Sequence, residues 1–172
     1  MNAKYKKSLK IISLLISALV IGTASAATYS YMYMNGSVII GSQQLVWLEG
    51  ADSPGGTVIA GGTVTLPLSV QPGVDQNFTE ALFLKNQDSA GHSVTINVTT
   101  ALLGADFDTA NAYIFTNATG DWVYADTLAL MTLSDGYSAT MAVDEYYRFT
   151  FEIQAKTSAS GTKNFVLQVT YT

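Results

Sequence analysis

Apolar and polar residues alternate along several segments of the chain, as expected for β-strands with one buried face and one solvent-exposed face. The clearest segments are 63–71, 93–99, 147–156 and 165–171. Pairs rich in glycine and proline separate them, and such pairs form turns. Short strands at this spacing predict an all-β fold, and specifically a single-domain β-sandwich such as an immunoglobulin-like one.

Two features depart from this regular pattern. Pro67 lies inside the segment 63–71. Proline cannot donate a hydrogen bond to a neighbouring strand, so we expect this strand to lie at a sheet edge or to bulge at Pro67. Segment 101–135 is less regular, and we expect a short helix or a longer excursion from the sheets there.

The first 26 residues have the pattern of a secretory signal peptide. Lys4–Lys10 is basic, Ile11–Gly22 is apolar, and Ala24 and Ala26 stand where a signal peptidase requires small residues. The apolar part is shorter than the ~20 residues that span a bilayer as a helix. We therefore expect a secreted protein that begins at Ala27, with an uncleaved leader as the alternative and the only route to a membrane.

The residues after the leader form a ribbon of tyrosine, methionine and aliphatic side chains, although chain ends are usually polar. Its large residues are Tyr29, Tyr31, Met32, Tyr33, Met34, Val38, Ile39 and Ile40. An isolated strand is unstable and needs a partner. The partner is either the sheet of the same chain, a hairpin across Asn35–Gly36, or another molecule.

Charge and residue types exclude several functions. The chain has 8 basic and 13 acidic residues, and half of the basic ones lie in the leader. The remaining four against 13 acids give −9, which excludes nucleic-acid binding because phosphate contacts need Lys and Arg. With no cysteine and one histidine, His92, which we interpret as a solvated turn residue, we expect no enzyme, cofactor or metal site.

A few acids are weaker candidates for chemistry. Asp106 and Asp108 supply the oxygen ligands of a calcium loop, but the spacing of an EF-hand is absent. A metal-dependent hydrolase that uses Asp106, Asp108 or Asp121 is the least favoured interpretation. We expect these side chains to be solvated loop acids.

Four N-x-S/T sequons mark glycosylation candidates in a secreted chain. They begin at Asn35, Asn77, Asn97 and Asn117. In the segment 93–99, Asn97 falls on the polar face of the predicted strand, opposite Val94, Ile96 and Val98. We therefore expect at least one of these asparagines to be exposed and to carry a glycan.

Two longer stretches carry a resemblance to known families. They are GTVTLPLSVQPGVDQNFTEALFLKNQDSAGHSVTINV at 62–98 and YYRFTFEIQAKTSASGTKNFVLQVTYT at 146–172. Together with the basic leader and the aromatic first strand, their order resembles the TasA and camelysin-like biofilm fibre proteins. It resembles still more the subunits of archaeal bundling pili. Camelysin-like proteins have also been assigned as metalloproteases, which one histidine and no zinc motif do not support.

The resemblance implies a β-sandwich subunit of jelly-roll type that polymerises when its N-terminal strand fills a groove in the next subunit, which is donor-strand complementation. Head-to-tail contacts of this kind do not close, so they produce filaments. We expect a signal peptide at 1–26, a donor strand at 27–40 and a pilin-like domain at 41–172. Identical subunits and laterally neighbouring filaments are the expected partners, at the cell surface.

The alternative function is a monomeric secreted adhesin or carbohydrate-binding module. In that case Trp47, Trp122 and surface tyrosines would form the platform for the ligand. Such a module would stay monomeric at any concentration.

Overall fold

The computed structural model describes residues 32–40, 44–60 and 63–172, and these residues form strands, turns and loops without a helix. The all-β prediction is therefore confirmed, and no described helix is long and apolar enough to cross a membrane. The strands are β1 (Met32–Ile40), β2 (Leu45–Glu49), β3 (Val58–Ala60), β4 (Thr63–Val70), β5 (Asp75–Asn86), β6 (His92–Thr100), β7 (Phe107–Thr116), β8 (Val123–Ala129), β9 (Gly136–Met141), β10 (Tyr146–Ala155) and β11 (Thr162–Tyr171).

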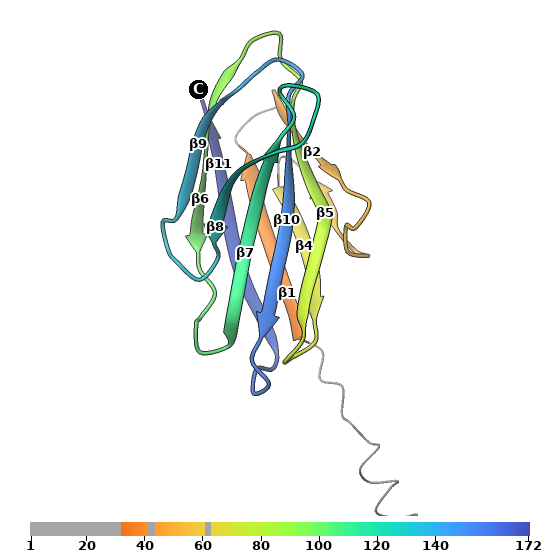
Figure 1. Ribbon diagram of the computed structural model, residues 1–172, viewed down its shortest axis with the longest axis vertical. Helices are drawn as coiled ribbons and strands as arrows, with labels where there is room; N and C mark the ends of the chain where they lie inside the picture. Colours follow the sequence, from red (N-terminus) through yellow and green to blue (C-terminus); the bar gives the residue numbers. More distant parts are fainter. Residues whose placement is uncertain (1–31, 41–43, 61–62) are drawn as a thin grey trace, which may run out of the picture.

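The strands form two sheets (Figure 1). The first sheet has the order β3-β4-β1-β11-β6-β9, and the second has the order β2-β5-β10-β7-β8. Among the described strands, β1 and β11 are the single parallel pair, and all other neighbouring strands are antiparallel. The first described strand therefore lies inside a sheet, between strands that are distant from it in sequence.

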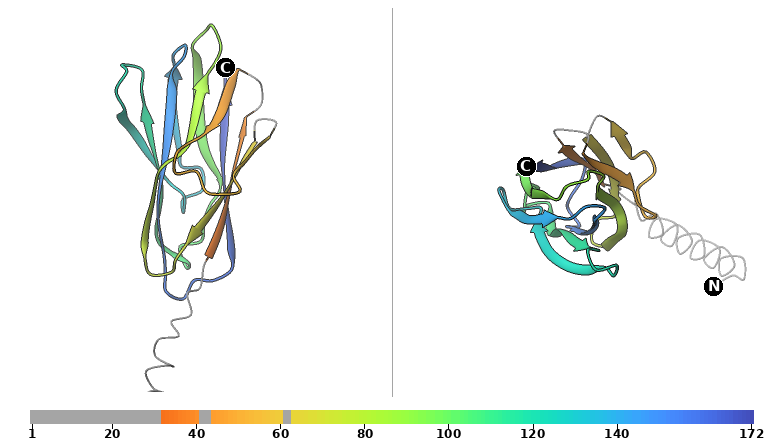
Figure 2. Two further views of the ribbon diagram at one scale, coloured as in Figure 1. Left: turned by 90° about the vertical axis from the view of Figure 1, so that its right-hand side faces the viewer. Right: turned by 90° about the horizontal axis from the view of Figure 1, so that it is seen from above.

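The two sheets face each other across a shared apolar core (Figure 2). Alternate residues of the long strands point into it, as in β10, where every second residue from Tyr147 to Ala155 is buried. Phe151 of the second sheet lies against Phe165 of the first, with ring centroids 5.8 Å apart. Burying such a side chain contributes about 1.5–3 kcal/mol to stability.

The alternating segments coincide with β4, β6, β10 and β11, so those predictions are confirmed. The expectation for 101–135 was wrong, because this segment supplies β7 and β8, which pair with each other. Buried residues alternate in β7 from Ala110 to Ile114, but most residues of β8 are exposed or half-buried, so the pattern of this segment has little contrast.

Pro67 lies in an interior strand, but at a locally open position. β3 pairs only with Thr63–Thr65 of β4. Pro67 lies beyond that pairing, where this side of β4 has no neighbour among the described strands. The missing N–H is therefore compatible with the sheet.

Candidate functional site

The site is the slot between β4 and β11 that β1 occupies (Figure 1). β1 pairs antiparallel with β4, where Met32 opposes Val70 and Ile39 opposes Thr63. It pairs parallel with β11, where Tyr33 is in register with Thr162. Without β1, both β4 and β11 would present unpaired backbone groups, which recruit another strand.

The slot is apolar on its inner face. Met34 of β1 is fully buried. The lining residues on either side are at most 1% exposed: Val64, Leu66, Leu68 and Val70 of β4, and Phe165, Leu167 and Val169 of β11. An empty slot would therefore expose a continuous apolar strip, and any strand that fills it gains both hydrogen bonds and burial.

Gly36 is the point of closest fit between β1 and the slot. It is buried and in register with Phe165 on one side and Leu66 on the other. A Cβ atom added at Gly36 would lie 2.6 Å from Cζ of Phe165, which is far inside contact distance. The ring cannot easily withdraw, because it packs against Phe151 of the opposite sheet.

The two ends of the slot lie at opposite poles of the elongated molecule (Figure 2). One pole, here the C-terminal pole, holds Ile40 in register with Val169, and Thr172 bonded through its backbone to Ser93. Leu45 pairs with Asn86, and the Asn86 side chain donates a hydrogen bond to Ala142 O. Ala142 follows Met141, which pairs with His92 at the end of β6 that lies at this pole. β1 therefore ends, and β2 begins, near the C-terminal pole.

The predicted donor residues divide into two groups. Met32, Tyr33, Met34, Val38, Ile39 and Ile40 belong to β1. Tyr29, Tyr31 and the leader 1–26 lie outside the described residues. The hairpin across Asn35–Gly36 is wrong, because β1 runs continuously through both residues and pairs along its length with β4. In the single chain, β1 fills the slot of its own sheet.

The sequons differ in accessibility. Asn77 is exposed on β5, whereas Asn97 on β6 is half-buried. Asn117 is also half-buried, and its Oδ1 accepts a hydrogen bond from the Tyr146 backbone N–H at 2.7 Å. Asn35 lies within β1, opposite Pro67. Asn77 is therefore the most accessible of the three asparagines whose side chains are described.

Asn97 lines an open depression of about 410 Å³. Val98 and Thr99 of the same sequon, together with Leu133 and Ser134, form the rest of the lining. Leu133 is 63% exposed. The depression contains no cluster of titratable groups and therefore offers no chemistry.

The acids that sequence reasoning considered do not form a metal centre. Oδ2 of Asp106 lies 2.8 Å from Nζ of Lys163, so an ion pair engages this carboxylate. Asp108 and Asp121 are exposed. Among residues 32–40, 44–60 and 63–172, no three His, Cys, Asp or Glu side chains gather closely enough to hold a metal ion.

The interpretation of His92 as a solvated turn residue was wrong. The residue is only 8% exposed, and its Nε2 lies 2.8 Å from Oδ2 of Asp88. Its ring also meets the edge of Tyr171, with centroids 5.2 Å apart. The hydrogen bond from His92, together with the Ser89 backbone N–H, lowers the pKa of Asp88. The i,i+4 spacing of Asp88 and His92 was the sequence signal for this pair.

Burial also affects a tyrosine near the C-terminal pole. Tyr147 is fully buried beside Tyr137, with ring centroids 5.9 Å apart. Desolvation raises the pKa of the Tyr147 hydroxyl far above its usual range. This group is therefore a neutral core residue and has no acid–base role near neutral pH.

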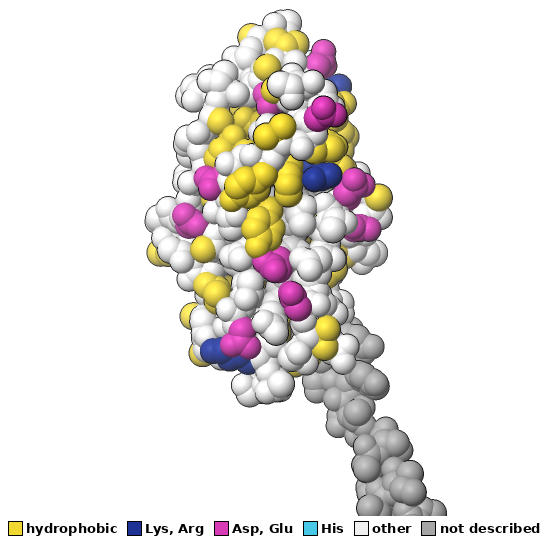
Figure 3. Space-filling view, in the orientation of Figure 1, with side chains coloured by type: hydrophobic (Ala, Val, Ile, Leu, Met, Phe, Trp, Pro, Cys, Tyr) yellow, Lys and Arg dark blue, Asp and Glu magenta, His cyan; other side chains and the backbone are white. Residues whose placement is uncertain are grey.

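The outer face of the second sheet carries an aromatic patch, of which the sequence analysis named Trp122 and surface tyrosines but not the phenylalanines or the arginine (Figure 3). We define it as Phe83, Phe115, Trp122, Tyr124 and Arg148. The Arg148 guanidinium lies 4.5 Å from the Phe115 ring centroid and 4.8 Å from that of Trp122. Phe83 contacts Trp122, and Phe115 contacts Tyr124, with centroids 5.6 and 5.9 Å apart.

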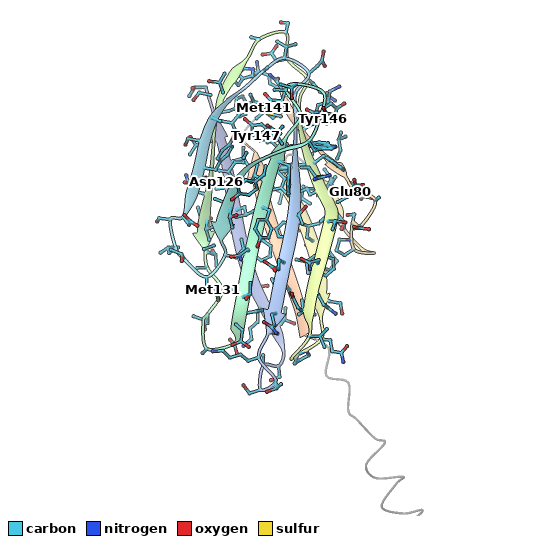
Figure 4. The ribbon with its side chains drawn as sticks, in the orientation of Figure 1. Glu80, Asp126, Met131, Met141, Tyr146 and Tyr147 are labelled. Atoms are coloured by element: carbon cyan, nitrogen blue, oxygen red, sulfur yellow. The ribbon has the colours of Figure 1, made fainter. Side chains whose placement is uncertain are left out.

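The patch is partly exposed and flanked by acids. Trp122 is 38% and Tyr124 is 55% exposed. Glu80 on β5 and Asp126 on β8 lie on either side of it (Figure 4). Trp47, the other proposed platform residue, is only 4% exposed and packs against Phe149, so that assignment was wrong.

Comparison with known proteins adds no identification. No family model matches the sequence, and no curated protein is significantly similar to it. The family resemblance drawn from the sequence pattern therefore stays a prediction.

Proposed function

We propose that this protein is a secreted structural subunit of an extracellular filament, such as a pilus or biofilm fibre. Each subunit inserts its N-terminal strand into the slot between β4 and β11 of the next subunit. The filaments bundle laterally and hold cells together. Assembly is the whole mechanism, and it needs no cofactor.

One observation carries the proposal: the first described strand is an interior strand of its sheet, and both strands that it pairs with are distant from it in sequence. β1 touches β4 and β11 along its length, while β2 belongs to the other sheet. A strand near the end of the chain can leave its sheet without any other segment having to pass through the fold. The slot that remains is apolar and has two unpaired edges, so it binds a strand of the same sequence.

The fold type is part of the same proposal. The two facing sheets are those of a β-sandwich, and we assign it to the jelly-roll or immunoglobulin-like group with β1 as the donor strand. The leader pattern at 1–26 supports export, and the exposed sequon at Asn77 supports surface glycosylation. The acidic, cysteine-free composition is compatible with a role outside the cell.

Electron microscopy and light scattering of the mature chain test this function. The chain from Ala27 should form filaments in a concentration-dependent way. The variant that lacks 27–40 should form none, and an added 27–40 peptide should cap the ends of wild-type filaments. A chain that stays monomeric at all concentrations, in the presence of seeds and at varied pH and salt, would refute the proposal.

A second candidate function rests on the aromatic patch. Aromatic faces beside a guanidinium and carboxylates can stack on a sugar ring and bond its hydroxyls, and exposed apolar patches commonly mark binding sites. In this alternative the protein is a monomeric adhesin. Glycan-array binding that Trp122→Ala and Tyr124→Ala abolish, without a change of oligomeric state, would favour it.

A further inference from the structure

We propose that β1 reverses its direction when it passes from its own sheet to a neighbouring subunit. In the single chain it runs parallel to β11. In the filament it runs antiparallel to β11, with Gly36 still opposite Phe165. This inference rests on the proposed function, and it specifies how the strand and the slot of two subunits meet.

The covalent connection to β2 restricts where β1 can go. The segment from Ile40 to Leu45 can span at most about 18 Å, whereas the nine residues of β1 are about 30 Å long. Leu45 stays in place, because it is 2% exposed and paired with Asn86. When β1 leaves its slot it therefore projects from the C-terminal pole, with its Met32 end pointing away from the subunit.

The polarity of a head-to-tail filament then determines the direction of insertion. The next subunit presents the opposite pole, where its own slot begins at Thr162. The strand enters at Thr162 and Met32 travels toward Val169, so the inserted strand runs against β11 and along β4. To insert parallel to β11, the segment between Ile40 and Leu45 would have to extend along the whole length of a subunit. That distance is greater than these residues can cover.

The position of Gly36 makes both directions fit the same slot. Gly36 is the middle residue of the nine in β1. When β1 reverses about Gly36, Gly36 itself stays under the Phe165 ring. Only glycine fits there, because an added Cβ would lie 2.6 Å from Cζ of Phe165. Side chains alternate along a strand, so reversal also keeps Met34 on the inner face. Gly36 therefore sets the register of the strand in the chain and in the filament.

The two directions place different residues opposite Asn164, which is exposed on β11. In the single chain Asn35 is in register with Asn164. After reversal about Gly36, Ser37 takes that position. Because the chain has no cysteine, two engineered pairs separate the alternatives: Asn35→Cys with Asn164→Cys, and Ser37→Cys with Asn164→Cys. Neighbouring strand positions are close enough for a disulfide.

The experiment uses the mature chain, produced in a host without N-glycosylation. The protein is mildly oxidised, and the linked products are separated on non-reducing gels. In monomers, the Asn35→Cys pair should close within one chain. In filaments, the Ser37→Cys pair should give a ladder of linked subunits, and the Asn35→Cys pair should give several-fold less. Asn164→Cys alone is the matched control and should give dimers at most.

A filament ladder from the Asn35→Cys pair and none from the Ser37→Cys pair would overturn the reversal, while strand exchange itself would stand. Filaments that form with no ladder from either pair would overturn the insertion of β1 into the slot of the next subunit, whereas the absence of filaments would overturn the proposed function. Filaments are assembled under reduction and oxidised afterwards, because an Asn35→Cys pair that closes in the monomer would hold β1 in its own slot. Closure of this pair in monomers oxidised separately shows that the variant folds.

Discussion

Met34→Ala measures directly how much β1 contributes by filling the slot. Met34 has no exposed surface and belongs to the central core, in a part of β1 that opposes Leu68. Truncation of a buried methionine to alanine costs about 2–5 kcal/mol, from lost transfer energy and the cavity that remains. The surrounding strands are hydrogen-bonded on both sides, so the cavity cannot close fully, and we expect a loss of about 3 kcal/mol.

Urea unfolding of the dilute monomer provides the assay. Trp47 reports on the core, because it is buried against Phe149 in the folded chain. With a slope of about 2 kcal/mol per molar urea, the midpoint should fall by about 1.5 M. Leu103→Ala is the control, since Leu103 is 67% exposed, and it should change stability by less than about 0.5 kcal/mol.

A Met34→Ala midpoint as close to wild type as that of the Leu103→Ala control would refute the reasoning. It would mean that β1 does not occupy the slot in solution. The interpretation of the slot as a strand-binding site would then lose its structural basis.

Three further perturbations have definite expected outcomes. Gly36→Ala should cost about 1–3 kcal/mol through overpacking against Phe165, whereas Gly55→Ala, where an added Cβ meets no atom within 4 Å, should have little effect in the same urea titration. Asn86→Leu should cost about 1–3 kcal/mol, because the fully buried amide donates to backbone carbonyls that would lose their partner; thermal unfolding measures this, and an unchanged melting temperature would contradict it. Asp88 has a lowered pKa in the folded chain, so its ionised form stabilises the fold above the unfolded pKa near 3.8, and that contribution is lost as pH falls below this value. Stability from pH 6 to about 3 should therefore fall less steeply in Asp88→Asn than in wild type, and parallel curves would contradict the role of the His92 contact.

Local alternation was enough to locate the strands whose one face is buried. β4, β6, β10 and β11 show it because every second side chain enters the core. The same logic failed for β8, where most residues are exposed or half-buried, so the pattern has little contrast. The alternation of apolar and polar residues reflects which side chains are buried. A strand at the edge of a sheet, such as β8, buries fewer side chains and therefore shows a weaker alternation.

The Asn35–Gly36 pair shows why local signals misled at the site. In isolation this dipeptide favours a tight hairpin turn. In the structure, pairing with β4 and β11 overrides that preference, and the glycine serves a packing role under Phe165 instead. That role depends on a residue far away in the sequence, so no local pattern contains it.

Trp47 and His92 were misassigned, and the full extent of the aromatic patch around Trp122 was missed, for a related reason. Trp47 lies in a short strand whose inner face is determined by its pairing with β5. The patch combines residues of β5, β7, β8 and β10 with Trp122 just before β8, which the sheet order brings together. The outward aromatic residues of β5 and β7 were the visible signal, but only the topology shows that they adjoin Arg148.

The central claim is that β1 of one subunit fills the slot of the next, and a cryo-electron microscopy reconstruction of filaments from the mature chain tests it most directly. The account predicts a strand between β4 and β11 whose density continues from Ile40 through to Leu45 of the neighbouring subunit. Density that connects this strand to β2 of its own subunit, with filaments held together by another surface, would contradict it.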